Sequence, residues 1–229
     1  MRPMRRILAI AAACAATVLA LAAPAQGASL RELGYSTAYP FPNADCPENC
    51  QAIAQVSGFQ VQLGRYDVPF RLKRPGWIVA FTVRLANPSD DQTSFFKSTY
   101  GDKPEARLAT LKRTKRKHRF KLLKQTQPFN LERFFGSTPT IALHQALRVH
   151  RDEIVAITVP TWLPAFAHNQ PRDMAWRSSH SGSDCTATNP GQGAQQRVGS
   201  VVFYGCFYRT ARLLLTTTFV ADPKQTNRP

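Results

Sequence analysis

Apolar and polar residues alternate along most of this chain, which is the pattern of strands that bury one face. Residues 51–63 alternate with one slip at Gly58, which predicts a strand with a β-bulge at that glycine. After a turn at 74–76, the apolar run at 77–85 ends at 87–90, which predicts a long central strand followed by a turn.

The same pattern continues toward the C-terminus. Residues 106–111 and 120–123 flank a basic stretch and predict a hairpin with a cationic tip. Further strands are predicted at four apolar runs: 138–149, 154–160, 199–208 and 211–220. No segment beyond the N-terminal leader shows a sustained apolar period of about 3.6 residues. We therefore expect an all-β fold, an antiparallel jelly-roll-like β-sandwich, preceded by a signal-peptide helix.

The N-terminal residues have the three-part pattern of a secretory signal peptide. Three arginines precede an apolar run from Ile7 to Ala23, and small residues follow as far as Gly27. An uncleaved anchor fits less well because the run is shorter than the ~20 residues of a spanning helix, and Cys14 lies in a poor context for lipidation. We expect a secreted protein, extracellular or cell-wall associated, with no transmembrane span after the leader is removed.

Four parts follow from these patterns: a signal peptide at 1–27, an extended N-terminal segment at 28–50, the β-sandwich domain at 51–222 and a flexible tail at 223–229. The mature length suits one sizeable core and does not demand two domains. Residues 171–196 are polar and rich in Ser, Gly and Asn, so we expect an ordered, displayed loop there.

Four cysteines remain after the leader, and an even number in an exported protein predicts two disulfides. Of the three possible pairings we favour Cys46–Cys50 and Cys185–Cys206. A four-residue separation in a turn can reach the ~5.5 Å Cα spacing of a disulfide, and the second pair would clamp the polar loop. Zinc is the competing interpretation, but there is no second close pair, and thiols rarely remain reduced outside the cell.

The formal net charge is +16, and because the leader contributes three arginines and no acid, the rest of the chain carries +13. This charge favours a polyanionic partner, such as an acidic cell-wall polymer, an acidic polysaccharide, nucleic acid or an anionic membrane face. A general bias toward arginine that serves solubility explains the charge almost as well.

The densest positive charge lies at the tip of the predicted hairpin, where a polyanion would be attracted and held in a salt-dependent way. The candidate polyanion-binding residues are Lys112, Arg113, Lys115, Arg116, Lys117, Arg119 and Lys121. A solvated loop explains the same residues equally well. Only Phe120 interleaves with the cations, whereas surfaces that bind single strands use several aromatic rings, so we expect no specific nucleic acid partner.

A second candidate surface is aromatic and follows the strand predicted at 154–160. The candidates for stacking on sugar rings are Trp162, Phe166, His168 and Trp176. Packing at the edge of the core is the commoner fate of tryptophan. We expect such packing for Trp162 and surface display for Trp176, because polar residues flank Trp176 on both sides.

Motifs of common enzymes are missing from the sequence, including the nucleophile elbow, the zincin helix, the P-loop and the dinucleotide-binding glycines. No pattern pairs two carboxylates as a glycosidase requires. We therefore assign no catalytic residue, no metal and no cofactor. Asp90 and Asp91 could ligate calcium, but a turn explains them more simply. A Ser-His-Asp triad remains open because its members can lie far apart in the sequence.

Three segments resemble a series found in secreted bacterial jelly-roll domains: 74–79, which starts Arg-Pro-Gly-Trp, then 106–111, then 147–157, which ends in an apolar strand. Their order is similar to that in carbohydrate-binding-module-like sandwiches and in uncharacterised secreted actinobacterial proteins. Arg151 stands where that series has the glycine of a Gly-Asp turn. The resemblance implies an architecture and identifies no catalytic or binding residue.

These observations favour a secreted, non-catalytic binding module, foremost for a cell-wall or extracellular glycan. The alternative is a structural or interaction protein of the envelope that binds an anionic polymer or a protein partner through the basic hairpin. An enzyme acting on glycans ranks third. Exposed, coplanar Trp162 and Trp176 would favour the first function, whereas a basic tip without an aromatic groove would favour the second. The sequence specifies no oligomeric state.

Overall fold

The structure is a computed structural model that describes residues 30–188 and 190–223. The expected signal-peptide helix therefore lies outside the described residues, as does nearly all of the expected tail. Within the described part, most regular structure is β-strand, as the alternation of apolar and polar residues predicts.

The strands are β1 (Leu30–Leu33), β2 (Ile53–Leu63), β3 (Tyr66–Asp67), β4 (Gly76–Val83), β5 (Glu105–Arg113), β6 (Arg119–Gln125), β7 (Phe129–Asn130), β8 (Thr140–Val149), β9 (Ile154–Leu163), β10 (Phe166–Ala167), β11 (Met174–Ser178), β12 (Val201–Phe203), β13 (Cys206–Arg209), β14 (Arg212–Leu213) and β15 (Leu215–Ala221). The α-helix is α2 (Asp90–Tyr100), and short 3-10 helices are η1 (Glu132–Phe134) and η2 (Gly182–Cys185).

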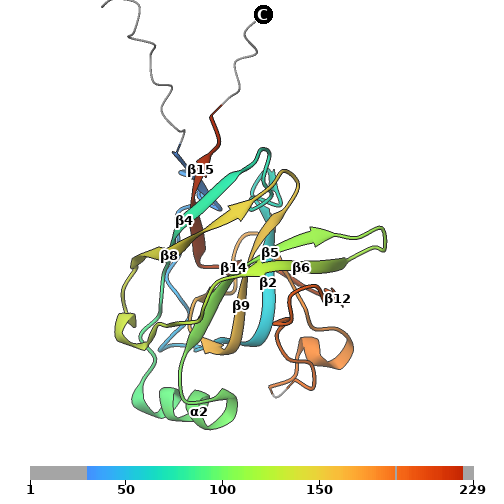
Figure 1. Cartoon of the computed structure of the whole chain (residues 1–229). Helices are drawn as coiled ribbons and strands as arrows, with labels where there is room; N and C mark the ends of the chain where they lie inside the picture. The colour runs from blue at the N-terminus through green and yellow to red at the C-terminus, as the bar shows by residue number, and fades with distance from the viewer. Residues whose placement is uncertain (1–29, 189, 224–229) are drawn as a thin grey trace, which may run out of the picture. The chain divides into compact units, whose positions relative to one another are not determined.

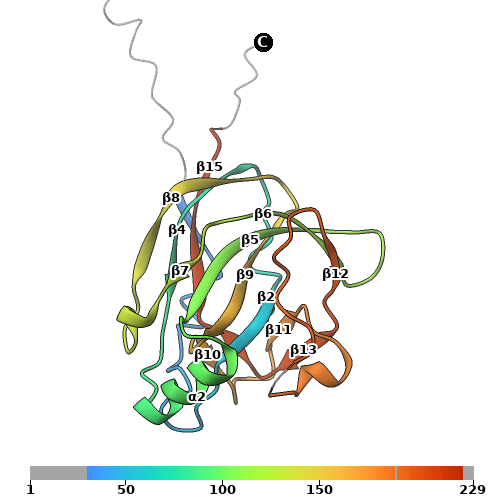
Figure 2. The same ribbon diagram turned by 60° about the horizontal axis from the view of Figure 1, so that its bottom comes forward.

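Two main antiparallel sheets build the sandwich (Figure 1). The small sheet has the strand order β1-β15-β4-β8, and the large sheet has the order β12-β6-β5-β9-β2-β11-β13. The large sheet is strongly curled, as Figure 2 shows. Strands β10 and β14 form a separate pair. The expected all-β, antiparallel sandwich is thus confirmed.

The core fills the space between the two sheets and lies against the concave side of the large sheet. Ile78 and Phe81 of β4 belong to the same buried cluster as Leu108 of β5 and Ile157 of β9. These side chains come from the apolar positions of the alternating pattern, and each is no more than 3 % exposed. Burial of such apolar side chains is the main force that holds the layers together.

The curl of the large sheet is held by Gln195, whose side chain is buried among backbone groups. Its amide nitrogen donates to Phe120 O at 3.3 Å and to Ser200 O at 2.9 Å, and its Oε1 accepts from Tyr204 Oη at 2.9 Å. Its backbone N–H donates to Ser57 Oγ at 3.1 Å. These bonds tie the segment before β12 to both β6 and β2.

Helix α2 is absent from the sequence-based expectation, which placed a turn at its first residues. Ser89 and Gln92 form a capping box, with each side chain accepting from the backbone N–H of the other residue. Asp90 and Asp91 occupy the first turn, where carboxylates favour the positive end of the helix dipole. This placement explains the two carboxylates without a calcium ion. Only Phe96 is buried, so the helix has almost no apolar stripe to recognise.

Strand β2 has its bulges at other positions than the expected one. The pairing with β9 shifts between Ala54 and Val56, where Gln55 has a φ of 48°. Gly58 is regularly paired and lies beneath the indole of Trp176. A Cβ atom on Gly58 would stand 2.6 Å from Trp176 Cζ3, so this glycine provides space for the ring rather than a bulge.

Gly58→Ala should therefore destabilise the fold by about 1–3 kcal/mol, because the new methyl group would overlap both the indole and the backbone of β11. Gly193→Ala is the matched control, since a Cβ there meets no atom within 4 Å. Urea unfolding of the two variants tests the difference. Equal stability of both variants and the wild type would contradict the packing described for Gly58.

Candidate functional site

The basic stretch forms the end of the β5–β6 hairpin, which extends from the large sheet (Figure 1). Lys112 lies opposite Lys121, and Arg113 lies opposite Phe120, so the strands remain paired close to the turn. Phe120 is buried and anchors the base of the hairpin against Phe59, with ring centroids 5.1 Å apart. The hairpin with a cationic tip is therefore present as predicted.

Short-range hydrogen bonds order the turn of the hairpin. The N–H of Thr114 donates to Arg119 O at 3.0 Å, and the N–H of Arg119 donates to Arg116 O at 3.2 Å. Thr114 Oγ1 also accepts from the N–H of Arg116 at 3.3 Å. The backbone is thus fixed while the charged side chains remain in solvent. Six of the predicted cations are exposed and Arg119 is half-buried.

No described acid forms an ion pair with any of these seven cations. The described ion pairs all lie elsewhere: Arg71–Asp152, Lys97–Glu132, Arg148–Asp222, Arg151–Asp152 and His168–Asp45. Because acids do not neutralise the hairpin locally, its positive field extends into solvent over roughly one Debye length, ~8 Å at physiological salt.

The field of the hairpin acts on His118, which lies in the turn. Burial lowers the pKa of His118 below its ordinary 6.5, and the positive charges of Arg177, Lys117 and Arg113 lower it further. Arg177 belongs to β11, so the basic region includes a residue that is distant in sequence. The pKa of Arg177 is itself lowered, first by burial and then by Arg113. His118 is therefore neutral at pH 7.

Trp162 lies in the core, as expected from sequence. It is 0 % exposed, and its ring packs against Phe96 at 4.9 Å and Phe135 at 5.7 Å between centroids. Its Nε1 donates to Gly101 O at 3.0 Å, so the polar group of the indole is satisfied internally. Trp162 attaches helix α2 to β9 and offers no face to a ligand.

The expected display of Trp176 is wrong. The residue is 4 % exposed, because the rings of Phe166 and Tyr208 pack against its indole in β11, which lies between β2 and β13 in the large sheet. Its ring stacks on Tyr208 with centroids 4.6 Å apart and 17° between planes. The segment 171–196 is correspondingly not one long loop. The exposed, coplanar pair of tryptophans that would favour a flat sugar-binding surface is not formed.

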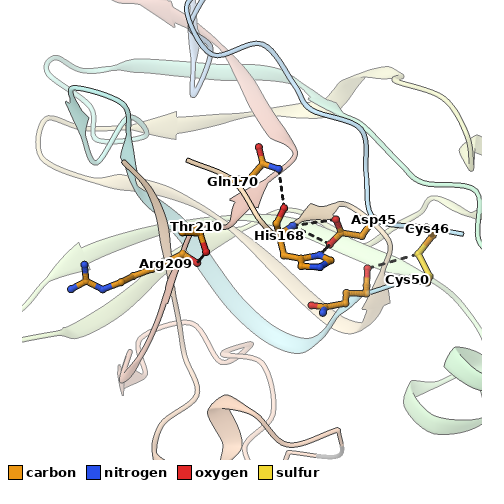
Figure 3. A network of polar contacts seen from close by, with 8 residues as sticks. Asp45, Cys46, Cys50, His168, Gln170, Arg209 and Thr210 are labelled. Carbon is orange, nitrogen blue, oxygen red and sulfur yellow. Dashed lines mark hydrogen bonds and ion pairs between the residues drawn. A yellow bond between two sulfur atoms is a disulfide. The ribbon is translucent and has the colours of Figure 1, made fainter. Parts of the chain in front are cut away.

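His168 is fixed by Asp45, as Figure 3 shows. The Asp45 carboxylate lies 2.6 Å from His168 Nδ1, and each of its oxygens accepts from the backbone N–H of His168 at 3.1 Å. Gln170 Nε2 donates to His168 O at 2.9 Å. These bonds hold the N-terminal segment with the Cys46–Cys50 disulfide against β10, which indicates a structural role for His168.

A pocket of about 550 Å³ lies between helix α2, the start of β2 and the segment around η2. Its aromatic lining includes Phe95, Phe96, Tyr100, Phe166, Trp176 and Tyr208. Phe95 is 48 % exposed, whereas Phe166 is 7 % exposed. Tyr100 donates its hydroxyl to Thr188 O, which joins the helix to the opposite wall. Two of the aromatic residues predicted to stack on sugars, Phe166 and Trp176, therefore line the pocket, but they are buried in its wall.

Both predicted disulfides are confirmed. Cys46 and Cys50 have Cα atoms 4.0 Å apart, and Cys185 and Cys206 have Cα atoms 5.4 Å apart. The second disulfide joins η2 to β13. Cys50 and Cys185 also line the aromatic pocket, so each disulfide fixes one part of its wall.

Residues 30–188 and 190–223 contain no group of three or more His, Cys, Asp or Glu side chains placed to hold a metal ion. In the same part of the chain, no helix combines the length and apolar character needed to cross a membrane.

Sequence reasoning missed Phe203 and Phe207, two aromatic residues that lie beside basic side chains. Phe203 is 39 % exposed, with the guanidinium of Arg119 at 5.7 Å from its ring centroid. Phe207 is 40 % exposed and has Arg177 at 5.0 Å and Arg209 at 5.5 Å. The alternating pattern at 199–208 predicted strand, but the pairing of these strands with β6 and β11 depends on the fold.

In comparisons with known proteins, no family model matched the chain, and neither a curated protein nor a solved structure matched it.

Trp176→Ala should lower the free energy of unfolding by about 3–5 kcal/mol, since it removes a buried indole and leaves a cavity. Trp77→Ala serves as the control because Trp77 is 40 % exposed, and its loss should cost clearly less. Chemical denaturation of both variants measures the difference. A Trp176→Ala variant as stable as the wild type would show that the ring is not part of the core.

Binding of a polyanion should raise the pKa of His118, because the anion offsets the neighbouring positive charges that lower it. Binding would then take up protons, so affinity for heparin should rise as the pH falls through the raised pKa of the bound protein and level off below the lowered pKa of the free protein. Calorimetric titrations across this range measure how the affinity for heparin depends on pH. This pH dependence should disappear in His118→Gln and persist in His144→Gln. Its persistence in His118→Gln would contradict the assignment of the proton uptake to His118.

Proposed function

We propose that this chain is a secreted, non-catalytic protein that binds an anionic extracellular polymer through the basic hairpin. The observation that carries the proposal is the set of seven cations on an ordered hairpin with no described acid paired to them. An anionic polymer would replace the counterions near this hairpin, which makes binding favourable at low salt and weaker at high salt.

The order of the turn also favours binding. The hydrogen bonds of Thr114 fix the backbone between β5 and β6 in the absence of a ligand. A binding surface that is already ordered loses less conformational entropy when its ligand arrives. Arg177 of β11 extends the same positive region beyond the hairpin, so a polymer chain would meet a surface rather than a single point.

The expected location agrees with this function. Two disulfides fit an oxidising compartment outside the cytoplasm. The proposal adds export by the N-terminal leader and association with the cell wall or the extracellular medium, where acidic polymers are available as ligands. An acidic polysaccharide of the envelope has the chemistry that such a hairpin would recognise.

Binding of a neutral glycan in the aromatic pocket is the second candidate function. The exposed ring of Phe95 and the pocket volume of about 550 Å³ support it, because a sugar ring can stack on an aromatic face. The flat tryptophan platform expected from sequence does not support it. We rank this function second because the pocket's rings other than Phe95 are buried or half-buried, and its one acid, Asp184, already accepts from two backbone N–H groups.

Reversal of three charges at the tip tests the leading function. Lys115→Glu, Arg116→Glu and Lys117→Glu together should weaken heparin binding at least about tenfold, while the melting temperature stays nearly unchanged because exposed charges contribute little to stability. Heparin affinity chromatography with a salt gradient gives the measurement.

The matched control carries Lys73→Glu, Lys103→Glu and Arg172→Glu, which change the net charge equally at exposed positions away from the hairpin. If both triple variants elute at the same salt concentration, overall charge rather than the hairpin determines binding. Salt-independent retention on a neutral polysaccharide, unaffected by either triple variant, would instead support the pocket.

A further inference from the structure

One face of the sheet edge beside the hairpin combines cations with exposed apolar side chains. Val201 pairs with Lys121, which in turn pairs with Lys112, and Phe203 pairs with Arg119. Paired residues of antiparallel strands place their side chains on the same face of the sheet. These five residues therefore share one face, which we name the edge face.

The intervening residues confirm this assignment of faces. Phe120 of β6 pairs with Val202 of β12, and both side chains belong to or pack against the buried core. Val201 and Phe203 must then point away from the core, and they are 46 % and 39 % exposed. Strand β12 is also the end strand of the large sheet, so no further strand of that sheet covers it.

Apolar exposure is concentrated in this region. Of the large apolar residues that are exposed in the described chain, four lie within ten consecutive positions: Val198, Val201, Phe203 and Phe207. Single exposed apolar residues are ordinary, but a cluster of them usually marks a binding surface. Two members of the cluster, Val201 and Phe203, lie along β6, whose Arg119 and Lys121 carry positive charge on the same face.

The combination of cations and exposed apolar side chains on the edge face indicates the chemistry of the partner. A soluble acidic polymer would gain from the cations but not from Val201, which has no ring or hydrogen-bonding group. A nucleic acid base would need the face of Phe203, which the guanidinium of Arg119 approaches at 5.7 Å. A lipid bilayer offers both anionic headgroups and an apolar layer directly beneath them.

We propose that the edge face docks on the surface of an anionic lipid bilayer. Val201 and Phe203 enter the headgroup region, while Lys112, Arg119 and Lys121 contact the lipid headgroups through their long side chains. The hairpin tip extends beyond β12 (Figure 1) and adds its cations to the same contact. The inference rests on the proposed function for its electrostatic part and goes beyond it in the apolar part.

Cosedimentation with lipid vesicles tests the inference, using residues 28–229, which contain the whole described core. The wild type should bind vesicles of phosphatidylcholine with 30 % phosphatidylglycerol and bind pure phosphatidylcholine vesicles far more weakly. Val201→Ser with Phe203→Ser should weaken binding to the anionic vesicles about tenfold, through the loss of apolar burial. The heparin elution of this variant should equal that of the wild type.

Leu30→Ser with Tyr66→Ser is the matched control, since both residues are exposed and lie away from β12. It should bind anionic vesicles as the wild type does. Should the first variant melt at a lower temperature, Val201→Thr replaces it, because this change keeps the shape of the side chain while a hydroxyl takes the place of one methyl group, and it should still weaken binding to the anionic vesicles.

Three outcomes would overturn the inference. The wild type could bind heparin but not anionic vesicles, or the serine variant could bind those vesicles as tightly as the wild type. In either case the proposed function stands while the apolar contact does not. The third outcome is a loss of single-stranded DNA binding in the Phe203→Ser variant alone, which would assign the ring to base stacking. Absence of binding to both heparin and vesicles would instead reject the proposed function itself.

Discussion

The hydrogen bonds of Gln195 determine where the two ends of the large sheet lie. Strands β12 and β13 are at opposite ends of that sheet, yet only Tyr204 and Gly205 separate them in sequence. The sheet must curl to bring these ends together, and the buried amide of Gln195 holds the segment that closes it. A buried amide left without partners would cost about 1–3 kcal/mol for each group, so the arrangement is strongly specified.

This constraint also determines which residues surround the basic hairpin. With the sheet curled, β12 pairs with β6, and Arg177 of β11 comes close enough to act on His118. The cations that are adjacent in sequence thus acquire neighbours from the last quarter of the chain. Tyr204 reinforces the closure, since its ring packs against Phe59 and Phe120 and its buried hydroxyl has a raised pKa.

Local patterns predicted the features that depend on local chemistry. Alternation predicted the longer strands, the run of cations predicted the hairpin tip, and the number and spacing of the cysteines predicted both disulfides. Helix α2 was missed because it buries only Phe96 and so has no apolar period. Trp176 was misplaced because its polar neighbours in sequence suggested a loop, although it lies in β11, where the rings of Phe166 and Tyr208 pack against its indole. The environment of Phe203 depends on long-range pairing, which one sequence does not contain.

The pairing of β1 with β15 joins the two ends of the described chain, with Leu30 opposite Val220. A polypeptide that emerges N-terminus first, from a ribosome or from an export channel, cannot complete the small sheet until its last strand is free. Until then β4 lacks its partner β15, and its unpaired edge and apolar side chains are open to other chains. The order of emergence therefore makes the final stage of folding the one most exposed to aggregation.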